Sequence, residues 1–330
     1  MAGNCNQKMK LLFIMKMLYE QTDENHTLSI NDIIAQLDMH EISAERKSIY
    51  SDIEVLKQFG LDVISRRSKN CGYYIAGREF ELPELKLLVD VVQSAKFITH
   101  KKSKELIKKL EALTSKHMAK ELQRHVFIVD RVKTFNEKIY YNIDALTQAI
   151  EEKKQVSFKY YEYTIEKKKQ YRNEGADYEV SPYELAWTED NYYLVAYYEK
   201  HGGLTHFRVD RMGDIKVLHE NIISLKQVTG KDNFNVAEYT KGIFNMYSGE
   251  MQSVQLLFYN SLINVVIDRF GEDVSIYKGD DTHFVARVNV NTSQTFLAWL
   301  FQFGDKVTIL SPQGLQEKMK EMTQKVTRLY

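Results

Sequence analysis

Basic side chains that could bind phosphate are concentrated near the amino terminus. Residues 43–78 hold seven lysines and arginines against four acidic residues, a local charge of +3, whereas the whole chain has 45 basic and 45 acidic residues. A protein that binds nucleic acid needs such a local excess, because its cations displace the counterions around the phosphates. This stretch therefore predicts a nucleic-acid-binding surface whose affinity depends steeply on salt.

A second pair of arginines lies far along the chain. Arg208 and Arg211 flank Val209 and Asp210, on or just past a predicted strand. A guanidinium presents a planar fork to a phosphate and also stacks on a base. In a regular strand Arg208 and Asp210 would point to one face of the sheet and Arg211 to the other. The pair predicts a separate site for an anion.

Other residues near these arginines could complete that site. Tyr183 and its neighbouring tyrosines offer stacking surfaces for a base, and His206 and Ser181 could form hydrogen bonds. A plainer interpretation stays open. In it the tyrosines fill the core of the sheet, and Arg208 and Asp210 form a surface ion pair worth under about 1 kcal/mol.

Local patterns predict the elements that hold the amino-terminal basic residues. Apolar residues recur with a helical period in residues 9–20, 29–37 and 43–59. Ser29 and Asp32 form a capping-box pattern at the start of the second helix, and Ser43 is the predicted N-cap of the third. Residues 61–78 then change to a period of two, which predicts two short strands around a basic turn.

The residue pattern of the third predicted helix indicates one buried face and one face that contacts DNA. Its apolar side chains at helical spacing are Ile49, Ile53, Leu56 and Phe59. A helix in the major groove needs one apolar face against its neighbours and one polar face toward the base edges. Three short helices followed by a basic hairpin therefore predict a winged helix-turn-helix. The predicted DNA contacts are Ser43, Arg46, Lys47, Ser48, Tyr50 and Ser51 in the helix and Arg66, Arg67 and Lys69 in the hairpin.

The rest of the chain predicts an α+β multidomain protein. A helical block without a functional signature follows the hairpin and is interpreted as a connecting arm. After residue 155 many short strands with polar turns predict a small β-barrel or curled sheet. The last eighty residues or so have the element order β-α-β-β-α-β, the split βαβ pattern, and a closing helix. The expected domains are residues 1–79, 80–138, 139–228 and 250–330.

Several motifs resemble the WYL-domain family of bacterial transcriptional regulators. The resembling segments are SPYEL at 181–185, NYYLVAY at 191–197 and FRVDR at 207–211, together with 48–53 and 72–75 for the winged helix of the family and Trp299-Leu300, Phe303-Gly304, Val307 and Leu310-Ser311-Pro312 for its C-terminal extension. The resemblance covers nearly the whole chain in the family's usual order.

The resemblance has one departure. The tryptophan of the eponymous triplet is Tyr192 here, and Trp187 lies five residues earlier. Aromatic residues substitute well for one another in strands. We therefore expect the strand and the fold to be retained, with a smaller part for the triplet in ligand contact.

The resemblance also implies what the domains do. It implies that an SH3-like barrel senses a ligand, often single-stranded nucleic acid or a nucleotide, and that the C-terminal extension is ferredoxin-like. By motif position, the implied ligand contacts are Ser181, Tyr183, Tyr193, His206, Arg208 and Arg211. We expect a homodimer on an operator in double-stranded DNA, since one helix reads only a few base pairs. No cofactor or metal is expected.

The sequence also bears on other functions and on the location of the protein. An enzyme acting on nucleotides or RNA is disfavoured, because the sequence has no P-loop, G-x-S-x-G, H-E-x-x-H or Rossmann fingerprint. An adaptor whose winged helix binds another protein stays open. Cys5 and Cys71 form no C-x-x-C pair, and no apolar segment is typical of a signal peptide or a membrane span. We therefore expect a cytoplasmic protein.

Overall fold

The computed structural model of the chain divides into two compact units, Met1–Glu137 and Lys138–Tyr330. It describes residues 2–67, 71–122, 133–134, 136–188, 190–231, 235–236, 239, 243 and 249–330. None of the helices in these ranges combines the length and the apolar character that a bilayer crossing requires.

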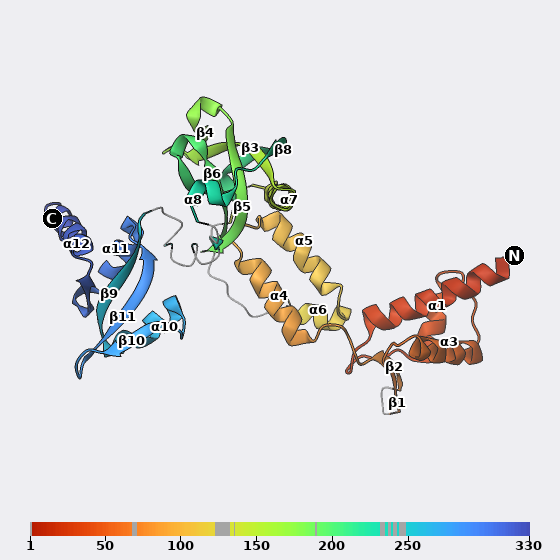
Figure 1. Cartoon of the computed structure of the whole chain (residues 1–330). Coiled ribbons are helices and arrows are strands. Elements are labelled where there is room, and N and C mark those ends of the chain that lie inside the picture. Colours follow the sequence, from red (N-terminus) through yellow and green to blue (C-terminus); the bar gives the residue numbers. More distant parts are fainter. Residues whose placement is uncertain are drawn as a thin grey trace. The chain divides into compact units, whose positions relative to one another are not determined.

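The first unit begins with three helices and a two-stranded hairpin (Figure 1). The elements are α1 (Ala2–Gln21), α2 (Ile30–Asp38), α3 (Arg46–Gln58), β1 (Val63–Arg66) and β2 (Gly72–Ile75). The two strands pair antiparallel, with Val63 opposite Ile75. The predicted capping box is confirmed, since the Ser29 side chain accepts from the Asp32 amide while the Asp32 carboxylate accepts from the Ser29 amide. A shared apolar core joins the three helices to the hairpin.

Two predictions about α3 are wrong. Its N-cap is Glu45, with extended φ and ψ, so Ser43 lies before the helix and does not cap it. Phe59 is 77% exposed, whereas Ile49, Ile53 and Leu56 are buried as predicted. The helix ends at Gln58, and Gly60 then takes a positive φ of 109°. The chain turns there, and the Phe59 ring leaves the apolar face.

Three further helices follow in the part of the first unit that the structure describes. They are α4 (Leu82–Ser94), α5 (His100–Glu111) and α6 (Lys116–Leu122). Pro83 lies in the first turn of α4, where its missing amide hydrogen costs no helical hydrogen bond. Leu85 and Val89 of α4 pack with Leu122 of α6 in a small core of their own. The described residues of the predicted arm therefore form short packed helices.

The second unit starts with α7 (Ile139–Glu151) and a curled antiparallel sheet. The strands are β3 (Lys154–Tyr163), β4 (Lys169–Tyr171), β5 (Tyr178–Thr188), β6 (Asn191–Tyr198), β7 (Gly203–Arg208) and β8 (Met212–Asn221). Their order is β4-β3-β5-β6-β7, and β8 also pairs with β3. Aromatic rings fill the concave side, with the Phe158 centroid 5.2 Å from that of Phe207 and 5.7 Å from that of Tyr178. The short strand β4 was not predicted.

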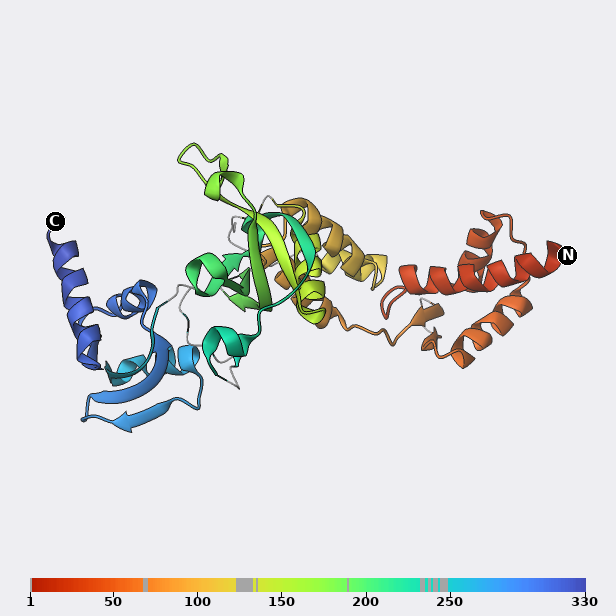
Figure 2. The same cartoon turned by 45° about the horizontal axis from the view of Figure 1, so that its top comes forward.

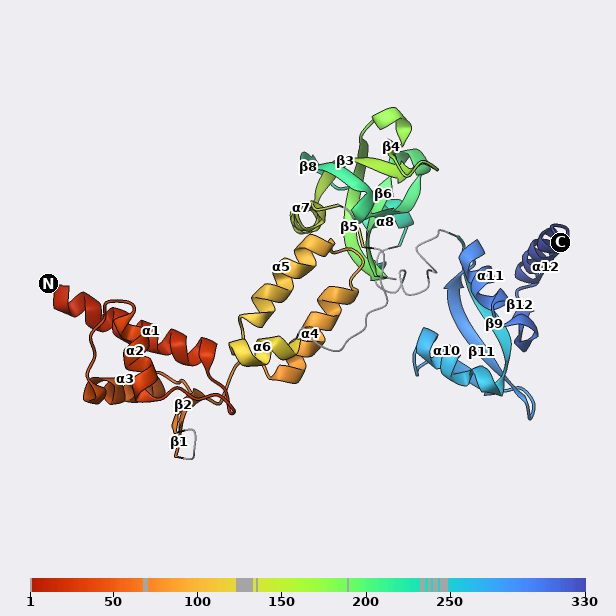
Figure 3. The same ribbon diagram turned by 180° about the vertical axis from the view of Figure 1, so that it is seen from behind.

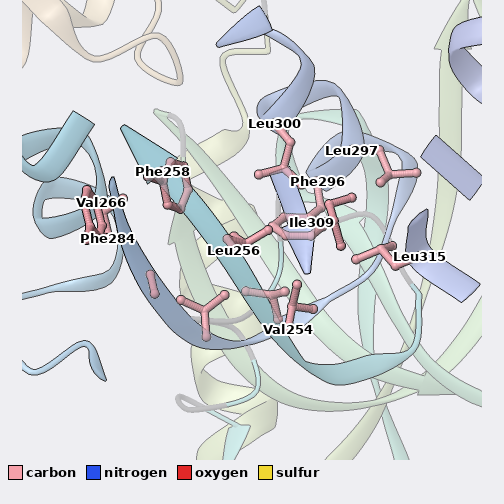
Figure 4. Close-up of a cluster of buried hydrophobic side chains, with 13 residues drawn as sticks. Val254, Leu256, Phe258, Val266, Phe284, Phe296, Leu297, Leu300, Ile309 and Leu315 are labelled. Atoms are coloured by element: carbon pink, nitrogen blue, oxygen red, sulfur yellow. The ribbon is translucent and has the colours of Figure 1, made fainter. Parts of the chain in front are cut away.

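The last part of the second unit has the predicted order of elements. They are β9 (Met251–Tyr259), α10 (Ile263–Phe270), β10 (Ser275–Lys278), β11 (His283–Asn291), α11 (Gln294–Phe301), β12 (Val307–Ser311) and α12 (Gln313–Thr327). The four strands form an antiparallel sheet of order β10-β11-β9-β12. Figure 3 labels β11, β9 and β12 of this sheet. Alternate residues of β9 and β11 face the helices. Phe258, Phe284, Val266 and Phe296 meet there in one buried cluster (Figure 4).

Candidate nucleic-acid interface and effector face

A groove of about 460 Å³ opens between the first turns of α2 and α3 and the β1–β2 hairpin. Its lining comes from three separate stretches of sequence, which the tertiary fold brings together. The lining residues are Ser29, Ile30, Asn31, Arg46, Tyr50, Ser65, Arg66, Arg67, Cys71, Gly72 and Tyr73. Four predicted DNA contacts, namely Arg46, Tyr50, Arg66 and Arg67, therefore face the same space.

Three arginines and two tyrosines give the groove its chemistry. Arg66 Nη1 donates to the Glu24 carbonyl at 2.6 Å, which holds that side chain against the loop between α1 and α2. The rings of Tyr50 and Tyr73 meet edge to face, with centroids 6.5 Å apart. Burial raises the pKa of Tyr73, so its hydroxyl stays protonated and can donate at neutral pH. The groove can thus offer guanidinium and hydroxyl donors to an anion.

The polar face of α3 is mostly open to solvent. Arg46, Lys47, Tyr50 and Ser51 are exposed, and Ser43 is exposed in the segment before the helix. The structure does not describe Lys69, which was predicted to contact DNA from the hairpin turn.

Two of the amino-terminal polar residues face inward. Ser48 is half-buried and accepts a hydrogen bond from the nearly buried Lys10 of α1. Arg78, which was counted in the local charge, donates to the Tyr19 and Thr22 carbonyls at 2.6 and 2.9 Å. Its guanidinium is therefore occupied within the unit, and the charge presented to solvent is smaller than the sequence count.

Strand register places four of the six predicted effector contacts on one face of the sheet. Tyr193 lies opposite Arg208, and Val195 lies opposite His206, in the β6–β7 pair. Ser181 lies opposite Tyr197 in the β5–β6 pair. Because side chains alternate along a strand, these residues lie on the face away from the aromatic core. This face, formed by Ser181, Tyr193, His206 and Arg208, is called the effector face below.

The segment after β8 contacts the effector face and forms hydrogen bonds with Ser181 of that face and with the nearby Tyr183. The Ser181 hydroxyl accepts from the Ile223 amide at 3.0 Å. The Tyr183 hydroxyl donates to the Ile223 carbonyl at 2.7 Å, and burial raises the pKa of Tyr183 to about 12. The rings of His206 and Tyr239 lie with centroids 5.7 Å apart. In this conformation Ser181 and Tyr183 therefore fix the path of the chain at Ile223.

Arg208 is held in a defined orientation. Its Nε and Nη2 donate to the two carboxylate oxygens of Asp210 at 3.0 and 2.9 Å, and Nη2 also donates to Asn191 Oδ1 at 2.8 Å. Burial acts to lower the pKa of Arg208, but the bonds to Asp210 raise it above its ordinary value. Arg208 thus stays charged at every relevant pH and is oriented by an acceptor on each side.

The predicted alternation past Arg208 is wrong, because the strand ends there. Val209–Arg211 form a turn of 3-10 helix. Arg211 is half-exposed at the end of this turn, close to the buried Tyr161. The Tyr161 hydroxyl donates to the Asp210 carbonyl at 2.8 Å. Arg211 therefore lies near β3, just past the strand that contains Arg208.

Comparisons with known proteins match two parts of the second unit. The WYL domain model matches residues 141–217, and the WCX domain model matches residues 250–327. The HTH-type transcriptional regulator YobV of Bacillus subtilis (strain 168) is 23% identical over 310 residues, which are 89% of this chain and 91% of that protein. The chain thus has a WYL domain and a WCX domain and is similar to a transcriptional regulator over most of its length, and these matches together support a WYL-domain regulator family. The resemblance inferred from the motifs is thereby confirmed.

A solved structure is also similar to this WYL-domain regulator. It is proteasome accessory factor B/C of Arthrobacter aurescens, with 18% identity and a TM-score of 0.27. The match covers 87% of the regulator and spans 44% of the length of that chain.

The eponymous triplet of the regulator keeps its strand despite the substitution. Tyr192 lies within β6 and pairs with Trp187 of β5, with ring centroids 5.1 Å apart. The expectation that an aromatic replacement preserves the strand is confirmed.

Sequence reasoning missed two contributors to the effector face and one strand of the same sheet. Ile223 and Tyr239 carry no motif, and only the tertiary fold brings them to the effector face. Strand β4 was not predicted because it lies in a lysine-rich stretch, although the alternating tyrosines of β3 before it favour a paired strand. Among the described residues, no group of three or more His, Cys, Asp or Glu side chains could hold a metal ion.

Proposed function

We propose that this WYL-domain regulator binds duplex DNA through a winged helix-turn-helix and responds to an anionic effector bound by its WYL domain. The proposed domains are the winged helix at residues 1–79, a helical arm at 80–138, an SH3-like WYL domain at 139–228 and a ferredoxin-like extension at 250–330. The name of the Bacillus subtilis relative, an HTH-type transcriptional regulator, supports the DNA-binding part.

The groove beside α3 is the observation that carries the DNA proposal. Arg46 from the helix and Arg66 and Arg67 from the hairpin line one space. A recognition helix in the major groove has the phosphate backbone at its first turn and at the wing. Arginine at both places suits phosphate, and the exposed Lys47 and Ser51 are free to approach the base edges.

The effector part of the proposal rests on Arg208 and Arg211. The hydrogen bonds of Arg208 to Asp210 and Asn191 use its Nε and Nη2 hydrogens, which leaves the two Nη1 hydrogens for a ligand oxygen. The half-exposed Arg211 adds a second charge nearby. A phosphate of a nucleotide or of single-stranded nucleic acid is the anion that such guanidinium groups favour. We propose no catalytic role for the chain, because no motif for one is present.

Duplex binding at several salt concentrations tests the DNA proposal. We expect the wild type to bind a labelled duplex that covers the region upstream of its own gene, with an affinity that falls steeply as salt rises. Arg46→Ala combined with Arg67→Ala should weaken binding and lower the salt slope by about 2, one for each lost phosphate contact. Arg287→Ala, an exposed arginine on β11, is the matched control and should change neither quantity.

Two results would count against the DNA proposal. One is an absence of duplex binding by the folded wild type at low salt. The other is a double variant that binds as tightly as Arg287→Ala. Recovery of a stoichiometric protein partner without DNA enrichment would instead favour the adaptor function.

A further inference from the structure

A cationic aromatic surface lies on the β3–β4 ribbon, apart from the effector face. Tyr161 and Tyr163 of β3 lie opposite Tyr171 and Lys169 of β4 in the antiparallel register. Lys159 is two residues before Tyr161, so its side chain points to the same side of the sheet. These five residues, Lys159, Tyr161, Tyr163, Lys169 and Tyr171, are called the ribbon face below.

Ring contacts organise the ribbon face. The Tyr161 centroid lies 5.7 Å from that of Tyr163 and 6.2 Å from that of Tyr171, both edge to face. Lys169 Nζ lies 4.3 Å from the Tyr161 centroid, and Lys159 Nζ lies 6.0 Å from the Tyr171 centroid. The two ammonium groups thus alternate with the rings across the ribbon.

Charge is divided between the two sides of the ribbon. The ribbon face has two lysines and no acidic residue among its five members. The one carboxylate of the paired segment, Glu162, points to the opposite side, where Arg172 Nη2 lies 2.8 Å from it. The neighbouring turn places the charges of both Asp210 and Arg211 near the Tyr161 hydroxyl, so a cation and a carboxylate meet at this end of the ribbon.

Edge protection explains only part of this arrangement. Lysines on an edge strand discourage pairing with another chain. That role requires no exposed aromatic rings, yet Tyr163 is 49% exposed and Tyr171 is 43% exposed. The turn that joins β3 and β4 extends away from the rest of the sheet (Figure 2). The exposure of these two rings leaves the ribbon face accessible to a long ligand.

We propose that the ribbon face binds single-stranded nucleic acid. Bases stack on Tyr163 and Tyr171, and Lys159, Lys169 and Arg211 bind the phosphates between them. Single strands suit this surface because their bases are free to stack, whereas those of a duplex are not. The inference rests on the proposed effector role of the same domain, and it lengthens the bound ligand from one phosphate group to several nucleotides.

Binding of a labelled oligothymidylate of about twelve nucleotides tests the ribbon face. Tyr163→Ala combined with Tyr171→Ala should raise its Kd about tenfold or more, because each lost ring removes one stacked base. An abasic oligonucleotide of equal length should bind the wild type more weakly than oligothymidylate does. It should bind the wild type and the double tyrosine variant with the same Kd. Lys159→Gln combined with Lys169→Gln should lower the salt slope by about 1.4.

Matched controls separate stacking from damage to the fold. Tyr277→Ala removes a ring that is 56% exposed on β10 and should leave the Kd unchanged. Tyr163→Leu combined with Tyr171→Leu keeps apolar bulk on the strands and should weaken binding as the alanine variant does. Thermal unfolding of each variant checks that the domain remains folded.

The outcomes distinguish this inference from the proposed function. The ribbon face is rejected if the tyrosine variants bind oligothymidylate as the wild type does, or if the abasic strand binds the wild type equally well. If Arg208→Gln loses oligothymidylate binding while the tyrosine variants bind as the wild type does, the effector proposal is kept and the ribbon face is rejected. Unchanged duplex binding by the tyrosine variants is expected, since the winged helix is a separate site.

Discussion

The imidazole rings of His26 and His117 stack almost parallel, with their centroids 3.6 Å apart and their planes 4° from each other. His26 belongs to the loop between α1 and α2, and His117 belongs to α6. Beneath them the buried Asp23 carboxylate accepts from the Ser115 hydroxyl at 2.5 Å and lies 2.7 Å from His26 Nδ1. This cluster joins the three-helix module to the helical arm, within the first unit.

The first prediction concerns pH. Burial, followed by the charge of His26, lowers the pKa of His117 from 6.5, while Asp23 raises it and Lys116 and Lys120 lower it further. As the pH falls below about 6.5, His117 is therefore protonated in the unfolded chain over an interval of pH in which it is still neutral in the folded chain. The free energy of unfolding should fall as the pH drops through that interval. His117→Gln should reduce this fall, measured as the change in Tm between about pH 7.5 and about pH 5.5.

Asp23 should not contribute to the change in Tm between about pH 7.5 and about pH 5.5. Burial acts to raise its pKa, but the hydrogen bonds from Ser115 and His26 bring the pKa below its ordinary 3.8. Its stabilising effect is present above that value and is lost only at lower pH, as the pH falls through the folded pKa. His219→Gln, an exposed histidine on β8, is the control. A His117→Gln protein with the wild-type slope would contradict the prediction.

The second prediction concerns the ion pair between α1 and α3. Lys10 Nζ lies 2.8 Å from Asp52 Oδ2, and the two side chains are only 7% and 19% exposed. Lys10→Met leaves the carboxylate without its cation and should cost about 3 kcal/mol in denaturant unfolding. Adding Asp52→Leu should restore most of the loss, because an apolar pair replaces the stranded charge. Lys16→Met on the same helix, at an exposed site, should cost under about 0.5 kcal/mol.

The third prediction concerns a lysine buried without a carboxylate partner among the described residues. Lys133 Nζ donates to the Val92 and Ala95 carbonyls at 3.1 and 2.9 Å and to the Ser103 hydroxyl at 2.9 Å. Lys133→Met removes these donors from the end of α4 and should cost about 1–3 kcal/mol of unfolding free energy. Lys101→Met, at a side chain that is 72% exposed, is the control. A Lys133→Met protein more stable than the wild type would mean that the cost of burying the ammonium dominates.

The fourth prediction concerns the proposed homodimer. Leu87 and Val91 lie one turn apart on α4 and are 66% and 56% exposed. A second copy of the chain is the partner that a regulator on a symmetric operator requires. The wild type should have about twice the chain mass of 38.7 kDa in light scattering, and Leu87→Glu with Val91→Glu should reduce it to one chain. Ile165→Glu, in the exposed β3–β4 turn, should remain dimeric. A monomeric wild type would exclude this interface.

Local signals determined much of the secondary structure. The capping box at Ser29, the apolar spacing of Ile49 and Ile53 and the order of elements after residue 250 all follow from interactions between residues near in sequence. Helical and strand periods depend on which side of a short element is buried, and a short window of sequence contains that information. The exposed Phe59 was missed because it lies one residue beyond the helix.

Which polar side chains remain available to a ligand was decided only by the tertiary structure. Ser181 is bonded to Ile223, 42 residues away, and Lys10 reaches Ser48 across 38 residues. The sequence determined that arginines and tyrosines are plentiful at both surfaces, since composition and spacing are its own properties. It could not determine their partners, because these depend on strand register and on the path of distant segments, which the packing of the whole domain selects.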